Sequence, residues 1–142
     1  MPVNELESFL ETWDREAENT LKLLKALPMT QYDFRPDAGG RSLGELAWHL
    51  AEGDAYVSYG IERGQFTMDA KPPTIDRPRT VGGLAPGYDR IHREAVARIR
   101  KLKPADLDRS VAFSGGPRSI RNLLWDGIVS SHTVSIIVAS SR

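Results

Sequence analysis

The side chains that could carry chemistry in this sequence are few, and its three histidines are the first candidates. They stand at positions 49, 92 and 132. The chain has no cysteine, which excludes disulfides, thiolate metal sites and cysteine nucleophiles together. Any metal ion must therefore be held by imidazoles and carboxylates.

His49 stands one position away from a predicted apolar stripe on a helix. Helical spacing assigns to that stripe Leu46, Leu50, Gly53 and Val57. The histidine should therefore border the core instead of facing open water. Such a position suits either a core-edge histidine that hydrogen-bonds a neighbour or a metal ligand. With no second ligand beside it in the sequence, the first interpretation is favoured.

The other two histidines differ in their surroundings. His92 stands among charged residues on a predicted helix, and we predict a half-exposed surface position without a catalytic role. His132 follows Leu124 and Ile128 at intervals of four, so it faces the interior if that helix continues. His132 is thus the best partner for His49, and these two are the predicted metal ligands.

Two imidazoles are only part of a metal site, because a transition metal needs at least three protein ligands to be held firmly. The carboxylates near enough in the sequence to contribute are those of Glu45, Glu52 and Asp126. None has diagnostic spacing, and Glu45 already has a predicted helix-capping role. No Ser-His-Asp arrangement can be singled out, because spatial triads leave no readable spacing, and catalytic residues stay unassigned.

Arg118 and Arg121 stand at the start of the last predicted helix. There they could draw an anionic substrate toward the free backbone amides of the helix N-terminus. Ordinary surface arginines are the simpler interpretation.

Length and charge place these residues in one electrically balanced domain. The 142 residues suffice for one hydrophobic core, and we predict a single domain over 1–142. The 19 basic residues balance 19 acidic ones, so no net field attracts nucleic acid or a membrane surface. The N-terminus lacks a secretory signal pattern, and no apolar run reaches the roughly 20 residues that span a bilayer. The predicted location is the cytoplasm.

Four helices are predicted to position the candidate residues. Apolar spacing predicts one helix over 4–27, and a capping box at Ser42 and Glu45 starts a second over 43–63. Prolines and glycines in 64–87 indicate a long connection, after which a third helix covers 88–102.

A loop over 104–117 then leads to Ser119, which can cap a fourth helix from Ile120. The predicted fold class is all-α, a four-helix bundle with a long crossover between helices 2 and 3.

The segment 40–51, GRSLGELAWHLA, and the segment 118–126 resemble the DinB-like family of four-helix bundles, which is unrelated to the DNA polymerase of the same name. The resemblance runs from Leu6 to about Asp126. It implies a divalent metal, often nickel or zinc, held by one histidine of the second helix and two of the fourth. His49 matches the first of these ligands.

Members of the family with known activity include thiol-dependent transferases and isomerases. The resemblance implies that the metal binds and activates a low-molecular-weight thiol, because a coordinated thiol loses its proton and becomes a nucleophile.

The fourth helix departs from the family pattern, which resembles His-x-x-His-His-Arg-Gly-Gln-Leu and places two ligands four residues apart. His132 can stand in for the first of the two, but position 136 is isoleucine. The implied three-histidine site is therefore incomplete in this chain.

The last residues, from about 127, differ in composition from the rest of the chain. From Ser130 they are rich in Ser, Val, Ile and Thr without charge until Arg142, which favours strand over helix. A reading frame displaced by one base permits His-His-Arg-Gly-Gln-Leu over 135–141, so we infer a frameshift relative to an intact ancestor. The coding DNA tests this, because the codons of Ser135, Ile136 and Ile137 must end in C. A divergent, uncharged end is the alternative.

These observations lead to a metal-dependent enzyme, of thiol-transfer or related type, with His49 and His132 as the remaining ligands of an incomplete site. Its partner would be a small-molecule substrate such as a low-molecular-weight thiol. The alternative is a metal-free helical bundle that acts as a dimerisation or interaction module. A nucleic-acid-binding domain is a third hypothesis that rests only on scattered arginines.

Overall fold

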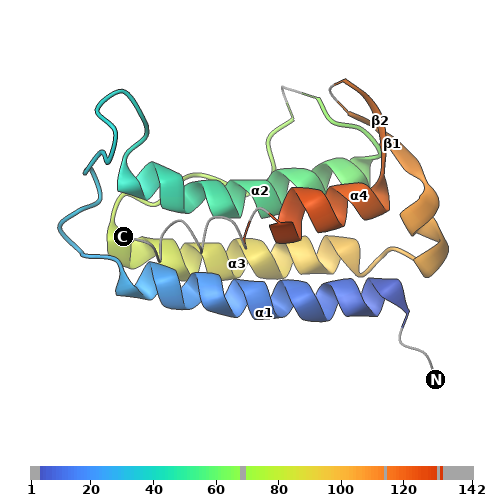
Figure 1. Ribbon diagram of the computed structural model, residues 1–142, viewed down its shortest axis with the longest axis horizontal. Coiled ribbons are helices and arrows are strands. Elements are labelled where there is room, and N and C mark those ends of the chain that lie inside the picture. Colours follow the sequence, from blue (N-terminus) through green and yellow to red (C-terminus); the bar gives the residue numbers. More distant parts are fainter. Residues whose placement is uncertain (1–3, 68–69, 114, 131, 133–142) are drawn as a thin grey trace.

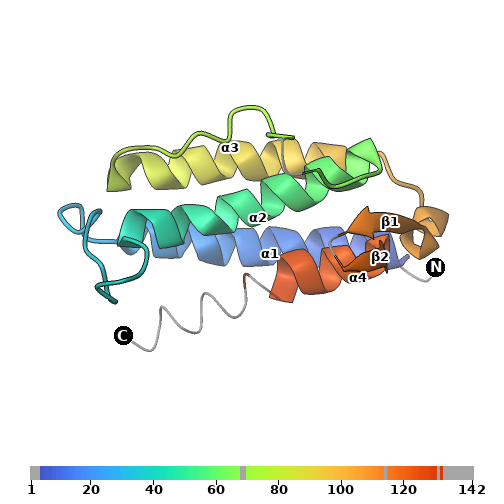
Figure 2. The same cartoon turned by 90° about the horizontal axis from the view of Figure 1, so that it is seen from above.

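The computed structural model describes residues 4–67, 70–113, 115–130 and 132. Three long helices lie side by side, and a short fourth helix packs beside them (Figures 1 and 2). The four helices are α1 (Glu5–Ala26), α2 (Leu43–Arg63), α3 (Val81–Ile99) and α4 (Ile120–Leu124). This arrangement confirms the predicted all-α bundle with a long crossover between its second and third helices.

The predicted helix starts are confirmed where a side chain caps the backbone. The Ser42 hydroxyl accepts from the Glu45 amide at 3.2 Å, and the Glu45 carboxylate accepts from the Ser42 amide at 3.1 Å. The Ser119 hydroxyl likewise accepts from the amide of Asn122 at 3.1 Å. Both caps satisfy amides that have no partner within the helix.

α3 begins at Val81, seven residues before the predicted start at position 88, and it contains Pro86. The Thr80 hydroxyl caps it by accepting from the Gly83 amide at 3.2 Å. Pro86 has no amide hydrogen to donate to the Gly82 carbonyl. Both residues are exposed, so water can satisfy that carbonyl, and the helix runs through the proline.

The predicted loop over 104–117 is wrong in detail, because it contains regular structure. A 3-10 helix, η1 (Pro104–Asp108), leads into an antiparallel hairpin of β1 (Ser110–Phe113) and β2 (Gly116–Ser119). The hairpin pairs Ser110 with Ser119 and delivers the chain to α4.

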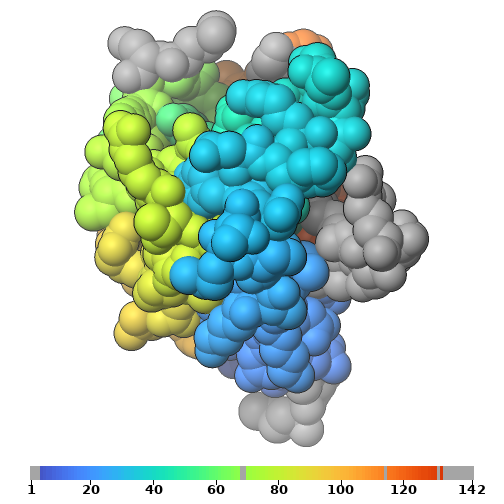
Figure 3. Space-filling model, turned by 90° about the vertical axis from the view of Figure 1, so that its left-hand side faces the viewer, coloured from blue at the N-terminus to red at the C-terminus, as the bar shows by residue number. Residues whose placement is uncertain are grey.

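The end of the bundle at the left of Figure 1 is closed by the connection between α1 and α2. Figure 3 looks onto this end, where that connection, in blue to cyan, lies beside the yellow-green segment before α3. The Tyr32 hydroxyl donates to the carbonyl of Pro78. A β-carbon at Gly44 would overlap the Tyr32 ring, so glycine is required there. No helix in the described ranges is long and apolar enough to cross a membrane.

The atypical end of the chain lies mostly outside the described residues. α4 continues into a π-helical segment, η2 (Trp125–Val129), and Ser130 and His132 are also helical. The strand preference inferred from composition therefore does not hold at these positions. The His-His-Arg-Gly-Gln-Leu motif that the inferred frameshift would restore covers positions 135–141, which the structure does not describe.

Candidate functional site

His49 lies on the outer surface of α2, where 62% of its side chain is exposed. Its Nδ1 atom is 3.7 Å from a carboxylate oxygen of Glu52. The prediction that His49 borders the core is wrong. The buried stripe of α2 is shifted by one position, about 100° around the helix, from the predicted stripe. The buried residues of α2 are Gly44, Trp48, Leu50, Ala51, Asp54, Ala55, Ser58, Gly60 and Ile61, so of the predicted stripe only Leu50 is buried.

The error has a physical cause. The prediction gave weight to the large aliphatic side chains, yet Leu46 is 46% exposed. The buried face of α2 combines Trp48, Leu50 and Ile61 with small residues, and α3 places a glycine against Trp48. A β-carbon at Gly87 of α3 would lie 3.1 Å from the Trp48 ring.

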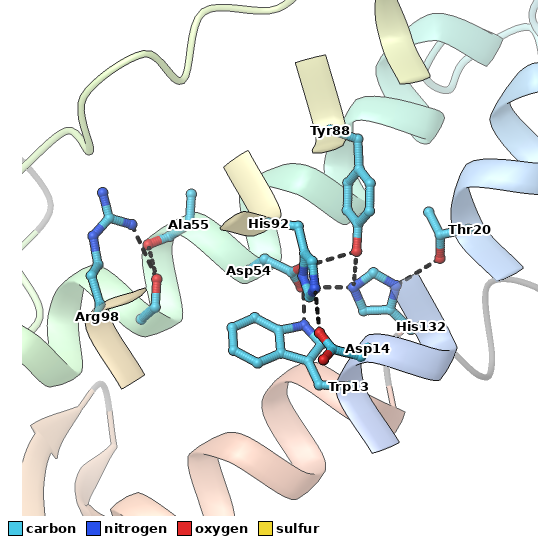
Figure 4. Close-up of polar contacts among 10 residues, drawn as sticks. Trp13, Asp14, Thr20, Asp54, Ala55, Tyr88, His92, Arg98 and His132 are labelled. Carbon is cyan, nitrogen blue, oxygen red and sulfur yellow. Dashed lines mark hydrogen bonds and ion pairs between the residues drawn. The ribbon is translucent and has the colours of Figure 1, made fainter. Parts of the chain in front are cut away.

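His132 lies in the interior as predicted, with an exposure of 1%. Its Nε2 atom is 2.6 Å from Asp54 Oδ1, and its Nδ1 atom is 2.9 Å from the Thr20 hydroxyl (Figure 4). Asp54 stands five positions after His49 on α2, so the two side chains point about 140° apart around the helix. His132 therefore shares a site with Asp54 and not with His49.

His92 is not at the surface, and this prediction is wrong. Only 7% of the residue is exposed, and its ring lies between those of Trp13 and Tyr88, at centroid distances of 4.9 and 5.9 Å. Its Nε2 atom is 3.1 Å from a carboxylate oxygen of Asp14, whose side chain is half-exposed. Its Nδ1 atom lies 3.5 Å from Asp54 Oδ2 but has no hydrogen-bond partner.

Asp54 is the centre of this arrangement, and the sequence analysis missed it. Its side chain is 1% exposed. Its Oδ2 atom accepts from the Trp13 indole at 3.1 Å and from the Tyr88 hydroxyl at 3.0 Å. With His132, which follows η2 in the chain, these donors link α1, α2 and α3 to one carboxylate (Figure 4). A carboxylate among Ala51, Ala55 and Ser58 at helical spacing was the available signal.

The charges around Asp54 decide its protonation state. Burial by itself would raise the pKa of Asp54, but the adjacent His132 and His92 lower it to about 2. Burial by itself would lower the pKa of His92, but Asp54 and Asp14 raise it above 6.5. Burial and the Asp54 carboxylate raise the pKa of the Tyr88 hydroxyl, which stays protonated and donates. Near neutral pH the centre therefore holds an ionised carboxylate.

The ionised carboxylate fixes the tautomer of His132. Because Asp54 can only accept, Nε2 of His132 carries the hydrogen that it donates. When the ring carries only this hydrogen, Nδ1 has a lone pair that can accept from the Thr20 hydroxyl, 2.9 Å away. The chain Thr20, His132, Asp54 has the roles of a hydroxyl–imidazole–carboxylate triad, with the two ring nitrogens exchanged.

The other candidates are engaged in local contacts. Glu45 caps α2, and the Asp126 carboxylate accepts from the Asn122 amide. Arg121 forms ion pairs with Glu5 at 2.9 Å and Asp108 at 2.6 Å. The Arg118 guanidinium donates to Asn122 at 2.6 Å and lies over the Phe113 ring. These arginines fit the simpler interpretation, that of surface residues.

The predicted metal ligands do not fit a shared ion as they are placed. Both ring nitrogens of His132 have partners, and His49 points away on the outer face of α2. Across the described ranges, no group of three or more His, Cys, Asp or Glu side chains is arranged to hold a metal. Nickel or zinc binding through His49 and His132 stays a prediction, and no chemical step is assigned to a metal.

The fold and this centre define a helical bundle built around a buried carboxylate–imidazole pair. Residues 12–128 match the model of the DinB superfamily, so the chain belongs to that superfamily. No curated protein matches the chain.

Two solved structures share the fold. A DinB-like protein from Bacillus cereus ATCC 10987 is 24% identical, with a TM-score of 0.72 over 94% of this chain and 89% of that chain. A DinB-like protein from Bacillus subtilis is 17% identical, with a TM-score of 0.73 over 93% of this chain and 89% of that chain.

Proposed function

We propose that this chain catalyses thiol-dependent group transfer on a small molecule, with Asp54 and His132 together as the base that takes the thiol proton. The thiol chemistry follows from the resemblance to the DinB-like family. The observation that supports the base is the 2.6 Å contact between His132 Nε2 and an ionised carboxylate inside the bundle. A base positioned in this way is the usual activator of a weak nucleophile.

In the proposed reaction a thiol takes the place of the Thr20 hydroxyl beside His132 Nδ1. Nδ1 accepts the thiol proton, and the ionised Asp54 stabilises the imidazolium that forms. The thiolate sulfur then bonds to an electrophilic carbon of the second substrate, and the leaving group departs with the proton from Nδ1. The base returns to its starting state.

Burial sets a requirement on this reaction. Thr20 is 0% and His132 1% exposed, so a thiol reaches Nδ1 only when the bundle opens beside Thr20. Local opening of this kind is common where few contacts hold a segment. Replacing Thr20 by Ser should therefore be tolerated, whereas filling the space with Thr20→Leu should reduce the rate.

The test is the transfer of a thiol such as L-cysteine to an activated aryl halide in the presence of a chelator. We expect Asp54→Asn and His132→Gln to lose at least about 100-fold in rate, the scale of general base catalysis. The matched controls Glu18→Gln, at an exposed position of α1, and His49→Ala should keep the wild-type rate. A wild-type rate equal to that of buffer would contradict the proposal. A rate that needs added nickel or zinc and is lost in His49→Ala would instead support the metal-dependent enzyme.

A second candidate function is the metal-free interaction module. Its support is the exposure of three large apolar side chains at the end of the bundle closed by the α1–α2 connection: Met29 at 67%, Phe34 at 53% and Leu46 at 46%. Light scattering distinguishes it, because a module of this kind is a dimer that Phe34→Ser weakens. A monomer at all concentrations would contradict it.

A further inference from the structure

A pocket of about 330 Å³ lies beside α2, lined by Trp48 of the buried stripe but not by Asp54. One wall comes from α2 and the residue before its cap, and the other from the segment before α3. Its buried floor is fixed, because the Trp48 indole donates to the Ile75 carbonyl at 2.9 Å. The volume is at the lower end of small-molecule pockets, which leaves room for a short ligand and not for a folded partner.

The chain runs in opposite directions along the two walls, α2 and the segment before α3. This arrangement determines which charged residues share each end of the pocket. At one end, the Ser42 backbone and hydroxyl hydrogen bonds lower the pKa of Glu45, and the nearby Arg77 lowers it further. At the other end, a hydrogen bond to Asp76 raises the pKa of Lys71, and the nearby Tyr56 adds to the effect. The start of α2 and residue 77 therefore share one end of the pocket.

The end at the start of α2 has a surplus of positive charge. Its members are two arginines and one glutamate, Arg41, Arg77 and Glu45. Glu45 is already engaged as the helix cap. Arg41 makes no hydrogen bond or ion pair with the described part of the chain. Arg77 donates to the Tyr32 hydroxyl at 3.0 Å and forms no ion pair with a carboxylate of the described residues. The N-terminus of α2 adds to this preference for an anion.

The opposite end has a surplus of negative charge. Lys71 and Asp76 pair with each other at 2.7 Å, which leaves the carboxylate of Glu52. The His49 imidazole lies 3.7 Å from the Glu52 carboxylate, and it forms an ion pair with it only when it is protonated. An ammonium group is the ligand group that this end suits best.

We propose that this pocket binds a zwitterion about 10 Å long, with its carboxylate at Arg41 and Arg77 and its ammonium group at Glu52. The length follows from the separation of seven positions between Glu45 and Glu52, which corresponds to a rise of about 10 Å along a helix. An extended tripeptide spans the same distance at about 3.3–3.6 Å per residue. The ligand class is therefore a short peptide with both ends free.

The probe is triglycine, titrated against 15N-labelled full-length protein up to tens of millimolar. We expect saturable chemical-shift changes at the Trp48 indole and in 41–56 and 71–77. N-acetyl-triglycine lacks the ammonium group, and triglycinamide lacks the carboxylate. Each should bind about tenfold more weakly, because one charge-assisted contact is lost.

Variants assign the two ends. Arg41→Gln should weaken triglycine binding about tenfold and leave triglycinamide binding unchanged. Glu52→Gln should likewise weaken triglycine binding about tenfold and leave N-acetyl-triglycine binding unchanged. Arg93→Gln, an exposed arginine of α3 that does not line the pocket, is the matched control. The absence of saturable shifts, equal binding of the blocked peptides, or equal binding of inorganic phosphate would each overturn the proposal. Thiol transfer at Asp54 is measured separately, so either proposal can fail alone.

Discussion

Asp54 and Glu52 stand two positions apart on α2, yet the protein uses these carboxylates in different ways. Asp54 faces inward at 1% exposure and receives hydrogen bonds from three side chains. The Glu52 side chain faces outward at 41% exposure, with one imidazole 3.7 Å away. A buried charge must be neutralised by close donors, whereas a surface charge is screened by water and stays available to a ligand.

Removing each carboxylate gives the largest expected difference. Asp54→Ala should lower the free energy of unfolding by about 3–5 kcal/mol, because it leaves buried donors without their acceptor. Glu52→Ala should change it by less than about 0.5 kcal/mol, as for exposed positions in general. Urea unfolding followed by circular dichroism measures both. Equal losses of unfolding free energy in the two variants would mean that Asp54 contributes no more to stability than the exposed Glu52.

Two tryptophan hydrogen bonds allow a charged acceptor to be compared with a neutral one. Trp13→Phe removes a hydrogen bond to the charged Asp54 and should cost about 1.5–3 kcal/mol. Trp48→Phe removes one to the neutral Ile75 carbonyl and should cost about 0.5–1.5 kcal/mol. Both changes keep an aromatic ring, so the same unfolding measurement compares the acceptors. A larger loss of unfolding free energy for Trp48→Phe would contradict the expectation that the bond to the charged acceptor is the stronger one.

Acid should weaken the inner centre. The folded pKa of Asp54 is lowered from 3.8 to about 2, so its contribution is complete above about pH 4 and is lost as the pH falls toward 2. The loss should approach about 2 kcal/mol. Unfolding free energies between pH 2 and 5 test this, with Asp54→Asn as the variant that lacks this loss. If Asp54→Asn lost as much unfolding free energy between pH 5 and 2 as the wild type, the result would argue against a lowered pKa of Asp54.

His92 should add a smaller dependence of stability on pH, at pH values above about 6.5. Because its folded pKa is raised above 6.5, its contribution is complete below about pH 6.5 and is lost as the pH rises through the folded value. His92→Gln should remove this decline, while His49→Ala, at an exposed position, should leave it in place. If His49→Ala removed it instead, the outer histidine would be the titrating group.

Much of the fold could be predicted from local signals. The caps at Ser42 and Ser119 and the apolar spacing of α1 gave the helices, because these interactions lie within a few residues of each other. The start of α3 was missed because Pro86 is tolerated only where the Gly82 carbonyl is open to water, which depends on the tertiary surface.

The candidate site was harder to predict for the same reason. His132 was placed correctly inside, since it continues the spacing of Leu124 and Ile128. His92 and Asp54 were missed because each is buried by partners on other helices that a linear pattern does not reveal. His49 was misplaced by an error of one position in the stripe of α2.

The protonation state of Asp54 is the most direct measure of the inner centre. With 13C-labelled aspartate carboxyls, and Asp54→Asn to assign its resonance, the Asp54 signal should keep the shift of a carboxylate well below pH 3.8 and titrate near pH 2. A midpoint at or above 3.8 would contradict an ionised carboxylate held by imidazole, indole and phenol donors, and with it the proposed base.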